Sequence, residues 1–518
     1  MQSMNSLNSI LLPAAMALSS VVAPCAAAES TTTSAADSAT IASRILRHAS
    51  LSEDFLTTAW RNPAILQFKR AYSFSEVAVA FDHSKQSEAV DVMRGDGSTT
   101  WEFKADSYMK YKTSTLWGQA FYQNARTHSV KWNETSDLDM VYPYIQADSI
   151  GGKINSETYG FMGGYANFNG RLAWGGTIAY QAGLNYRNVD PRPRNVTANL
   201  SASAGLAMAV RQRHLVGAAI SFQKYKQTND IDFYSELGHD KVFHLTGFGN
   251  DYTRFAGAGQ NTYYNGYRYG AELNFHPTDG HGLSAAASAS RFSIDNILTE
   301  FNKLPLCHIA HTAYEAEVAW TSTSWGVAAK GNYSRRVGTE NVFGDPAGNV
   351  YMQIGSIPQY HENRANIEAK AFWQHQWSRF FLGLQPSIAY SHLNAIYASP
   401  ASLEQINSLT SSLLARAHML LNGTASLQFT VGAAIKSALN DKWNVPSANT
   451  ELTGLLAARQ HTHNALSGNS TATSASLAFF KAISCRYALK AEVKWNRTGY
   501  SYHDISDNQI TAQLAFIF

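Results

Sequence analysis

The 518-residue chain carries 41 Lys and Arg against 38 Asp and Glu, a formal net charge of +3. This near balance gives no support for a nucleic-acid partner or a strongly acidic one. After the first segment no apolar run of about 18 residues occurs, which excludes transmembrane helices. Charged residues make up only 15% of the chain and aromatic residues 12%. With a mean hydropathy of −0.24, this composition fits a protein wall that faces lipid.

The start of the chain predicts export. Residues 10–22 form a short apolar stretch, and an A-x-A cleavage site follows at 26–28. These features predict a secretory signal peptide over residues 1–28, although no Lys or Arg precedes Arg44. A lipoprotein with an acylated Cys25 is the alternative. The chain is exported in either case.

Residues 29–69 are expected to form a flexible and helical lead-in. Ser, Thr and Ala dominate residues 30–40. The S-L-S-E sequence at 50–53 is a capping box that predicts a short helix through Trp60. Asn62-Pro63 ends this helix, because a residue before proline disfavours helical backbone. The segment either hangs in the periplasm or plugs a barrel.

From residue 70 to residue 518 the sequence predicts a β-barrel domain. In 486–496 the apolar residues share one face of a strand, and Lys490, Glu492 and Lys494 share the other. About eighteen such strands are expected, with fourteen or sixteen as alternatives. They lie near 70–83, 99–110, 113–126, 157–168, 171–187, 197–211, 214–227, 263–275, 281–293, 312–321, 324–335, 364–377, 379–391, 412–421, 424–436, 473–484, 486–496 and 508–518.

Short and long connections alternate along these strands. Short turns include Asn169-Gly170 and Asn422-Gly423, whereas long polar loops are expected at 126–156, 228–261, 336–363 and 437–472. Short turns at one end and long loops at the other are typical of a transmembrane barrel. A soluble sandwich has no reason to separate its loops in this way. The predicted fold class is therefore all-β, a transmembrane antiparallel β-barrel with both chain ends on the periplasmic side.

Two short sequences resemble those of known outer-membrane barrels. The ending N-Q-I-T-A-Q-L-A-F-I-F resembles the C-terminal recognition strand of bacterial outer-membrane β-barrels, whose last residue is typically Phe. This resemblance implies that Phe516 and Phe518 are an assembly signal read by the barrel-assembly machinery; an ordinary edge strand is the alternative. Asn62-Pro63-Ala64 resembles the N-P-A near the start of fatty-acid-transporter-like barrels, although helix termination also explains this triplet.

No catalytic or metal motif is recognisable. Resemblance to outer-membrane proteases would need paired Asp and His residues, and resemblance to the outer-membrane phospholipase would need a Ser, His and Asn set; no spacing reproduces either. We therefore expect no enzyme and no cofactor. The metal-ligating residue types gather in two places: Cys307, His308 and His311, and His461 and His463. Solvated loop histidines and no metal are expected at both, because structural zinc sites usually need four ligands. Cys307 and Cys485 are expected to be unpaired thiols.

The charged inner faces suggest a wet lumen. The candidate lumen-lining residues are Lys490, Glu492, Lys494, Glu368, Lys370, Glu315, Glu317, Arg268 and Glu272. An internal salt-bridge network that braces the barrel is the alternative role. A barrel of eighteen strands is wide enough for an aqueous channel unless it is plugged. The mixed signs argue against strong ion selection.

The chain as a whole resembles the uncharacterised outer-membrane barrel families of Gram-negative bacteria, porin-like or fatty-acid-transporter-like. The resemblance implies an outer-membrane channel or transporter component for small solutes or nutrients. Residues 29–69 are too short for the plug domain of energy-coupled receptors, so no energy coupling of its own is expected. The alternatives are a surface-binding or assembly barrel that acts through its long loops, and an outer-membrane hydrolase. Expected partners are outer-membrane lipid, the assembly machinery and a candidate receptor or lipoprotein.

Overall fold

The computed structural model describes residues 40–518, apart from 212, 237–240, 258–260, 349 and 447–448. The predicted signal peptide and Cys25 lie outside the described residues. None of the described helices is both long enough and apolar enough to cross a membrane.

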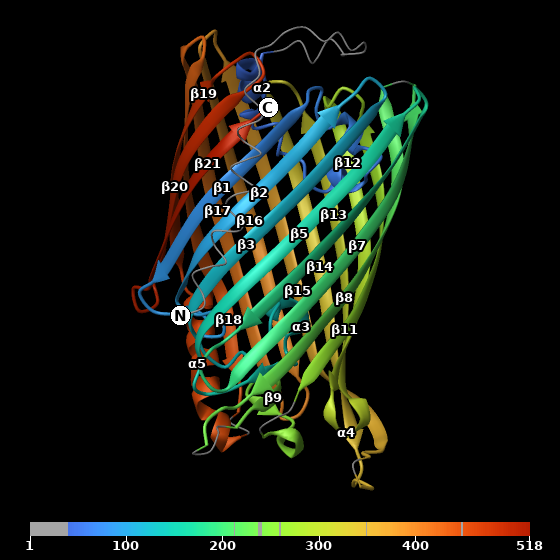
Figure 1. The fold of residues 1–518 in the computed structure, drawn as a ribbon, viewed down its shortest axis with the longest axis vertical. Coiled ribbons are helices and arrows are strands. Elements are labelled where there is room, and N and C mark those ends of the chain that lie inside the picture. Colours follow the sequence, from blue (N-terminus) through green and yellow to red (C-terminus); the bar gives the residue numbers. More distant parts are fainter. Residues whose placement is uncertain (1–39, 212, 237–240, 258–260, 349, 447–448) are drawn as a thin grey trace.

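Eighteen antiparallel strands form one closed barrel (Figure 1). Each predicted strand has one counterpart, so the predicted fold class and strand number are confirmed. The strands are β1 (Phe74–Gln86), β2 (Gly97–Lys110), β3 (Ser114–Val130), β5 (Gly152–Phe168), β6 (Leu172–Tyr186), β7 (Arg192–Val210), β8 (His214–Asp232), β11 (Thr262–Pro277), β12 (Gly282–Leu298), β13 (Leu304–Thr321), β14 (Trp325–Phe343), β15 (Gln353–Gln376), β16 (Phe380–Tyr397), β17 (Ser402–Asn422), β18 (Ala425–Asn444), β19 (Ser470–Ala482), β20 (Ala488–Tyr500) and β21 (Ser506–Ile517).

The barrel closes where its last strand pairs with its first. β21 pairs with β1 over Asp507–Ile517 and with β20 on its other side. The backbones of Ser75 and Phe518 exchange two hydrogen bonds of 2.9 Å just beyond the ladder. Closure leaves no unpaired sheet edge, which a strand standing in lipid requires.

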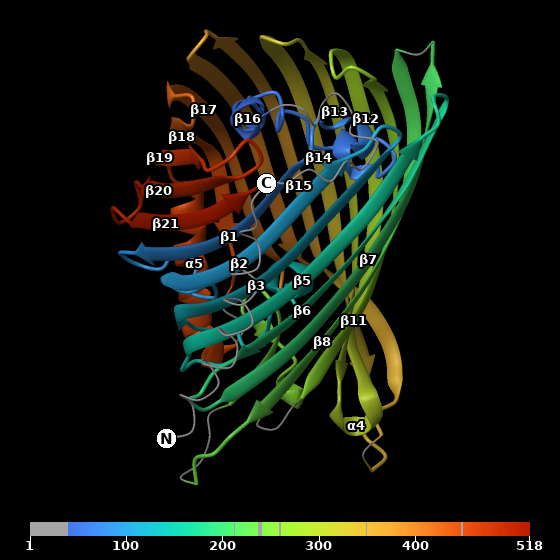
Figure 2. The ribbon, with the colours of Figure 1, turned by 45° about the horizontal axis from the view of Figure 1, so that its top comes forward.

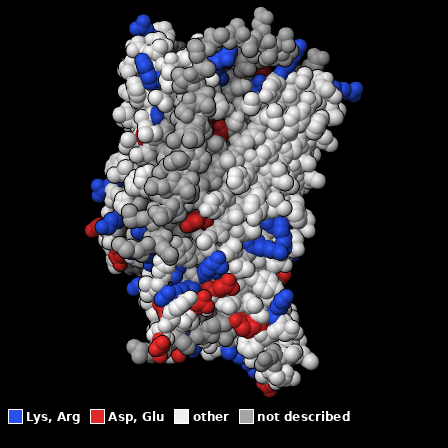
Figure 3. All heavy atoms as spheres, in the orientation of Figure 1, with Lys and Arg blue, Asp and Glu red and all other residues white. Residues whose placement is uncertain are grey.

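The alternation of side chains sorts the wall into an apolar outside and a polar inside. Large apolar side chains on the outer face stay well exposed, as with Phe161 (61%), Ile220 (68%) and Leu514 (67%). Figure 3 shows a broad band of this face with few charged side chains, while Lys, Arg, Asp and Glu gather toward the lower end. A barrel in water would not leave this much apolar surface exposed, so the band is the surface that lipid covers.

Short turns lie at one end of the barrel, which we call the turn end, together with the chain terminus at Phe518 (Figure 1). The other connections lie at the opposite end, the loop end. Several predicted long loops are shorter than expected, because the strands continue past the apolar band. The predicted loop 336–363 is largely a hairpin of β14 and β15. β15 has 24 residues, about twice the length needed to cross a bilayer. Beyond the lipid both faces meet water, so the apolar alternation that marks a strand in sequence is lost.

Residues 40–73, which we call the plug, lie inside the turn end (Figure 2). The plug contains α2 (Ile41–His48), η1 (Ala59–Arg61) and η2 (Leu66–Phe68), and β1 begins four residues later than the predicted residue 70. The predicted helix from Ser50 to Trp60 is wrong. The Ser50 hydroxyl donates to Gln374 Oε1 (2.9 Å), and Glu53 accepts from Arg70 instead of capping a helix. Contacts with the wall thus override the local capping signal.

Three loop-end connections fold inward to form a lid, comprising the described parts of 131–151, 233–261 and 445–469. The lid contains a three-stranded sheet of β4 (Gln146–Ala147), β9 (Phe243–Gly247) and β10 (Asn250–Asp251). Its helical elements are α3 (Leu138–Val141), η3 (Thr253–Phe255), η4 (Thr450–Leu452) and α5 (Thr453–Ser467); α4 (Glu300–Lys303) lies in another connection. The barrel is therefore filled from both ends.

Candidate functional site

The plug crosses the mouth of the barrel from wall to wall. α2 packs Ile41 and Ile45 against the end of β19–β21, and the Ile41 amide donates to the Cys485 carbonyl (2.9 Å) in the β19–β20 turn. Leu51 and Phe55 then pack against β13–β15. Ala64 and Ile65 reach the opposite wall at β6–β8. Contacts with three separate parts of the wall fix the plug across the opening.

Two acidic residues of β13 hold the middle of the plug. The Glu317 carboxylate accepts from the backbone amides of Thr57 (3.1 Å) and Thr58 (2.7 Å). The neighbouring inward carboxylate, Glu315, accepts from the Thr58 hydroxyl and pairs with Arg61 (3.0 Å) and Lys330 (3.2 Å). These candidate lumen residues thus face inward and bind the chain's own plug.

Asn62-Pro63-Ala64 sits in a cradle of three wall glycines. Asn62 is fully buried; its side chain donates to Asn274 Oδ1 (2.9 Å) and accepts from the Ala64 amide (3.0 Å). A Cβ at Gly205 would lie 1.9 Å from Asn62 Oδ1, and one at Gly175 would lie 2.8 Å from the Pro63 carbonyl. Gly217 completes the cradle, since a Cβ there would lie 2.9 Å from Asn62 Nδ2. The triplet is therefore a docking element as well as a helix-ending sequence.

The lid is fastened by a buried charged triad. The Arg187 guanidinium pairs with Glu134 (2.7 Å) and Asp148 (2.8 Å), and each of the three side chains is at most 1% exposed. Burial raises the pKa of the Glu134 carboxyl well above its usual range. Asp148 is also buried, but hydrogen bonds and the charge of Arg187 outweigh burial and lower its pKa. One guanidinium thus serves two acids, and this geometry ties residues 131–151 to the β6–β7 connection.

The rest of the lid packs as an ordinary apolar core. Tyr144, Ile145 and Leu245 are buried against wall residues that include Tyr264 and Phe292. Arg336 on β14 donates to the carbonyls of Tyr142 (2.9 Å) and Asp139 (2.6 Å). The lid therefore closes the loop end by packing and by side-chain hydrogen bonds to its backbone.

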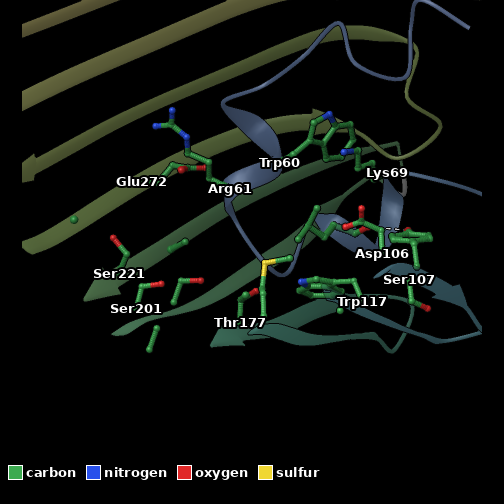
Figure 4. A pocket seen from close by; sticks show the side chains of 18 of the residues that line it. Trp60, Arg61, Lys69, Asp106, Ser107, Trp117, Thr177, Ser201, Ser221 and Glu272 are labelled. Atoms are coloured by element: carbon green, nitrogen blue, oxygen red, sulfur yellow. Dashed lines mark hydrogen bonds between the residues drawn. The ribbon is translucent and has the colours of Figure 1, made fainter. Parts of the chain in front are cut away.

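Two adjoining cavities remain between plug and lid, with volumes of about 860 and 670 Å³. They share Arg61, Arg268, Ser288 and Ser290 in their lining, and we call them together the chamber. Figure 4 shows Trp60 and Arg61 of the plug across the first cavity from Thr177, Ser201 and Ser221 of the wall. These wall positions carry small hydroxyl side chains, which leave space for water or a small solute.

Cations outnumber acids along the chamber lining, which differs from the balanced signs of the sequence-derived set. The first cavity is lined by Arg61, Lys69, Arg70, Lys104 and Arg268 against Glu76, Asp106 and Glu272, and the second by Arg61, Arg268, Arg364 and Lys436 against Glu315. Arg268 has no acidic partner within ion-pair distance among the described residues. Its guanidinium lies 4.9 Å from the Phe292 ring, and its buried Nε makes no hydrogen bond within the described chain.

The other candidate lumen residues have diverse surroundings. Lys490 pairs with Glu492 (2.9 Å) and lies 3.7 Å from Glu76. Lys370 lies over the Phe55 ring of the plug, and Glu272 accepts from Asn274 beside the Asn62 cradle. Lys494 lies on the same face of β20 as Lys490 and is paired with Thr511 of β21. Glu368 lies on the same face of β15 as Lys370 and is paired with Lys330 of β14. The sequence left open whether residues 29–69 plug the barrel, and it could not show which lumen residues the plug contacts, because strand alternation does not reveal what a lumen residue touches.

The two histidine-containing segments that were expected to be loops lie on a strand and on a helix. Cys307, His308 and His311 lie on β13, where alternation directs His308 to the opposite face from the other two. The two candidate histidines at 461 and 463 lie on α5, and residues two apart on a helix do not face each other. Cys307 is buried and Cys485 is exposed in the β19–β20 turn, and both are free thiols.

One His–Asn pair occurs on the barrel wall. His392 of β16 donates to Asn407 Oδ1 of β17 (2.5 Å). Among the described residues, no serine hydroxyl forms a hydrogen bond with His392.

A family model described as "Family of unknown function (DUF6850)" matches residues 63–518. The chain belongs to this family. The matched region contains the whole barrel and the part of the plug that begins at Pro63. A search of curated proteins found no match to the chain.

Solved structures with a similar fold include receptors and a channel. The ferric preacinetobactin receptor BauA of Acinetobacter baumannii is 7% identical, with 87% of this chain and 80% of that chain covered and a TM-score of 0.42. The ferric enterobactin receptor of Pseudomonas aeruginosa, as a mutant, is 10% identical with 86% and 80% covered and a TM-score of 0.37. The CymD monoaromatic hydrocarbon channel is 10% identical with 89% and 92% covered and a TM-score of 0.31. The barrel of this chain is established by its own strand pairings.

Proposed function

We propose that this protein is a gated outer-membrane channel for small polar solutes, with both chain ends on the periplasmic side. The observation that carries the proposal is the chamber between plug and lid. Its lining carries charged and small hydroxyl side chains beside apolar ones, and a closed barrel with an apolar outer band surrounds it. A barrel that binds partners only through its outer loops does not require a chamber of this kind in its interior. The cationic excess favours neutral or anionic solutes over cations.

Passage requires the plug to move, because its contacts cross the whole turn end. The plug meets the wall through a few polar anchors, chiefly Glu315, Glu317 and the Asn62 cradle, with small apolar clusters between them. Such a segment can leave the wall without unfolding the barrel, since the strand ladder does not include it. This short plug is also the reason to propose a channel that is not energy-coupled by itself.

A disulfide tether tests the proposal. In a Cys485→Ser background, Asn62→Cys and Gly205→Cys together place two thiols where the plug and β7 touch. In planar bilayers the reduced protein should show conductance steps, and oxidation should abolish them because the plug can no longer move. Each single variant under the same oxidant is the control.

Two results would contradict the proposal. Equal conductance of the oxidised and reduced double variant would mean that passage does not require the plug to move, so the plug would not be the gate. Silence of the folded wild-type protein in bilayers and in liposome-swelling assays with small sugars would favour a surface-binding barrel.

A further inference from the structure

Three connections at the loop end converge beside the seam where the barrel closes. They are the β1–β2 connection, helix α5 of the lid, and the β20–β21 connection. Val90, Ala465 and Ile505, one from each, form a buried apolar cluster. Backbone and side-chain hydrogen bonds between Ser87 and Ser506 (2.9 and 3.0 Å) join two of them. The meeting point is therefore built by packing, independently of any ligand.

Each of these connections supplies one potential metal ligand at the meeting point. Glu88 comes from the β1–β2 connection, His461 from α5 and His503 from the β20–β21 connection, and their ligand atoms all lie within 4.8 Å of one another. His461 Nδ1 is 3.8 Å from Glu88 Oε1, and His503 Nδ1 is 3.3 Å from Glu88 Oε2. Ligands bound at about 2.1 Å in a tetrahedral zinc site lie about 3.4 Å apart. The observed separations bracket this value.

The surroundings of the two rings suit metal ligation. His461 Nε2 is 3.1 Å from the Ala89 carbonyl and donates its proton there. This fixes the tautomer and leaves the Nδ1 lone pair directed toward Glu88, at a distance too long for a hydrogen bond. The His503 ring stacks on Tyr502 with a centroid distance of 4.0 Å, which restricts its orientation. A ring nitrogen held by a carbonyl on one side and open on the other is the usual arrangement of a metal-bound histidine.

We propose that Glu88, His461 and His503 bind a Zn²⁺ ion, with water in the fourth position. Two imidazoles and one carboxylate suit Zn²⁺, and Cu²⁺ and Ni²⁺ are also accepted by such a nitrogen-rich set. The bound ion fastens helix α5 of the lid to the two connections that flank the β1–β21 seam. The site is independent of the proposed channel, because it depends only on the loop-end geometry.

Zinc binding is measured on the full-length protein in detergent, without a polyhistidine tag, by competition with a fluorescent zinc chelator. The wild type should bind one Zn²⁺ per chain at micromolar or lower concentration. His461→Ala and His503→Ala should each weaken binding by about tenfold or more, since each removes a direct ligand. His281→Ala, at an exposed turn of the opposite end, is the matched control and should bind as the wild type does.

Cu²⁺ provides a second measurement that does not depend on affinity. The electron paramagnetic resonance spectrum of the Cu²⁺-loaded wild type should show nitrogen hyperfine coupling from two imidazoles, and each histidine variant should lose one. Heat-modifiable migration on gels confirms that each variant is a folded barrel. Binding only at millimolar Zn²⁺, or unchanged binding by the His461→Ala/His503→Ala double variant, would overturn the proposal.

Discussion

At the residue scale, three glycines of the barrel wall position the plug, because their missing Cβ atoms leave room for it. Gly175, Gly205 and Gly217 have no Cβ where the Asn62-Pro63-Ala64 backbone and side chain come closest. The sequence shows these glycines but not their role. In the strand alternation, an inward glycine looks like any other small lumen residue. Asn62-Pro63-Ala64 was identified in the sequence, but its partners on β6, β7 and β8 became visible only in the fold.

Gly175→Ala should loosen the plug, because the new methyl group would lie 2.8 Å from the Pro63 carbonyl carbon and oxygen and 3.0 Å from the Ala64 amide. Overpacking of this kind costs about 1–3 kcal/mol. The expected results are faster proteolysis within residues 40–73 and more frequent conductance steps. The matched control is Gly176→Ala on the same strand, whose nearest neighbour would be 3.5 Å away. Equal effects of the two substitutions would rule out a cradle role for Gly175.

At the element scale, the lid depends on one arginine placed between two strands. Arg187 follows directly after β6, and its two acidic partners lie in the β3–β5 connection. The sequence predicted long polar loops in this region and had no means of showing that they fold inward, because loop polarity alone does not distinguish a solvated loop from one paired through buried charges. The same limit applied to α5, which was expected to be part of a loop.

Arg187→Met should open the first lid segment, because it leaves two buried carboxyls without their cation. Breaking a buried pair costs about 3–5 kcal/mol. Hydrogen exchange at β4 and β9 should therefore rise strongly, while exchange in β12 should not change. Burial raises the pKa of the Glu134 carboxyl, so lowering the pH protonates this acid readily. In the Arg187→Met variant, protonation of the unpaired carboxyl should partly restore protection.

The control for this change is the neighbouring ion pair. Arg192 and Asp190 also lie 2.7 Å apart, but their side chains are 39% and 21% exposed. Arg192→Met should therefore change exchange little, because an exposed ion pair contributes little to stability. A large effect of Arg192→Met, or none of Arg187→Met, would contradict the assignment of the lid's anchor.

At the scale of the whole molecule, the closing strand carries both the seam and the outer aromatic residues. Phe516, on the outer face of β21, stacks on Tyr487 of the β19–β20 turn (5.6 Å between ring centroids) and lies beside the terminal Phe518 (6.0 Å). The inner-face neighbours Ala515 and Ile517 are buried instead. The aromatic residues are thus not needed to fill the barrel, which leaves recognition during assembly and contact with lipid as their proposed roles.

Replacing Phe516 and Phe518 with Gln should reduce the amount of folded barrel in the outer membrane several-fold, because the proposed assembly signal is lost. The measurement is heat-modifiable migration of membrane fractions, together with protease resistance. The control is Phe479→Gln, which removes an exposed aromatic side chain from β19 without touching β21. Normal insertion of the Phe516 and Phe518 variant would mean that β21 is an ordinary edge strand at the time of assembly.

The sequence by itself determined the barrel of about eighteen strands, its apolar outer band and the separation of turns from loops; the pairing of the strands then settled the number. These follow from a two-residue period and from turn residues, both of which are local. Only the tertiary structure decided that the lumen is filled from both ends, that the inward Glu315 and Glu317 bind the plug, and that Glu88, His461 and His503 meet. Each of those facts joins residues far apart in the chain, and a local pattern contains no information about which distant residue lies opposite.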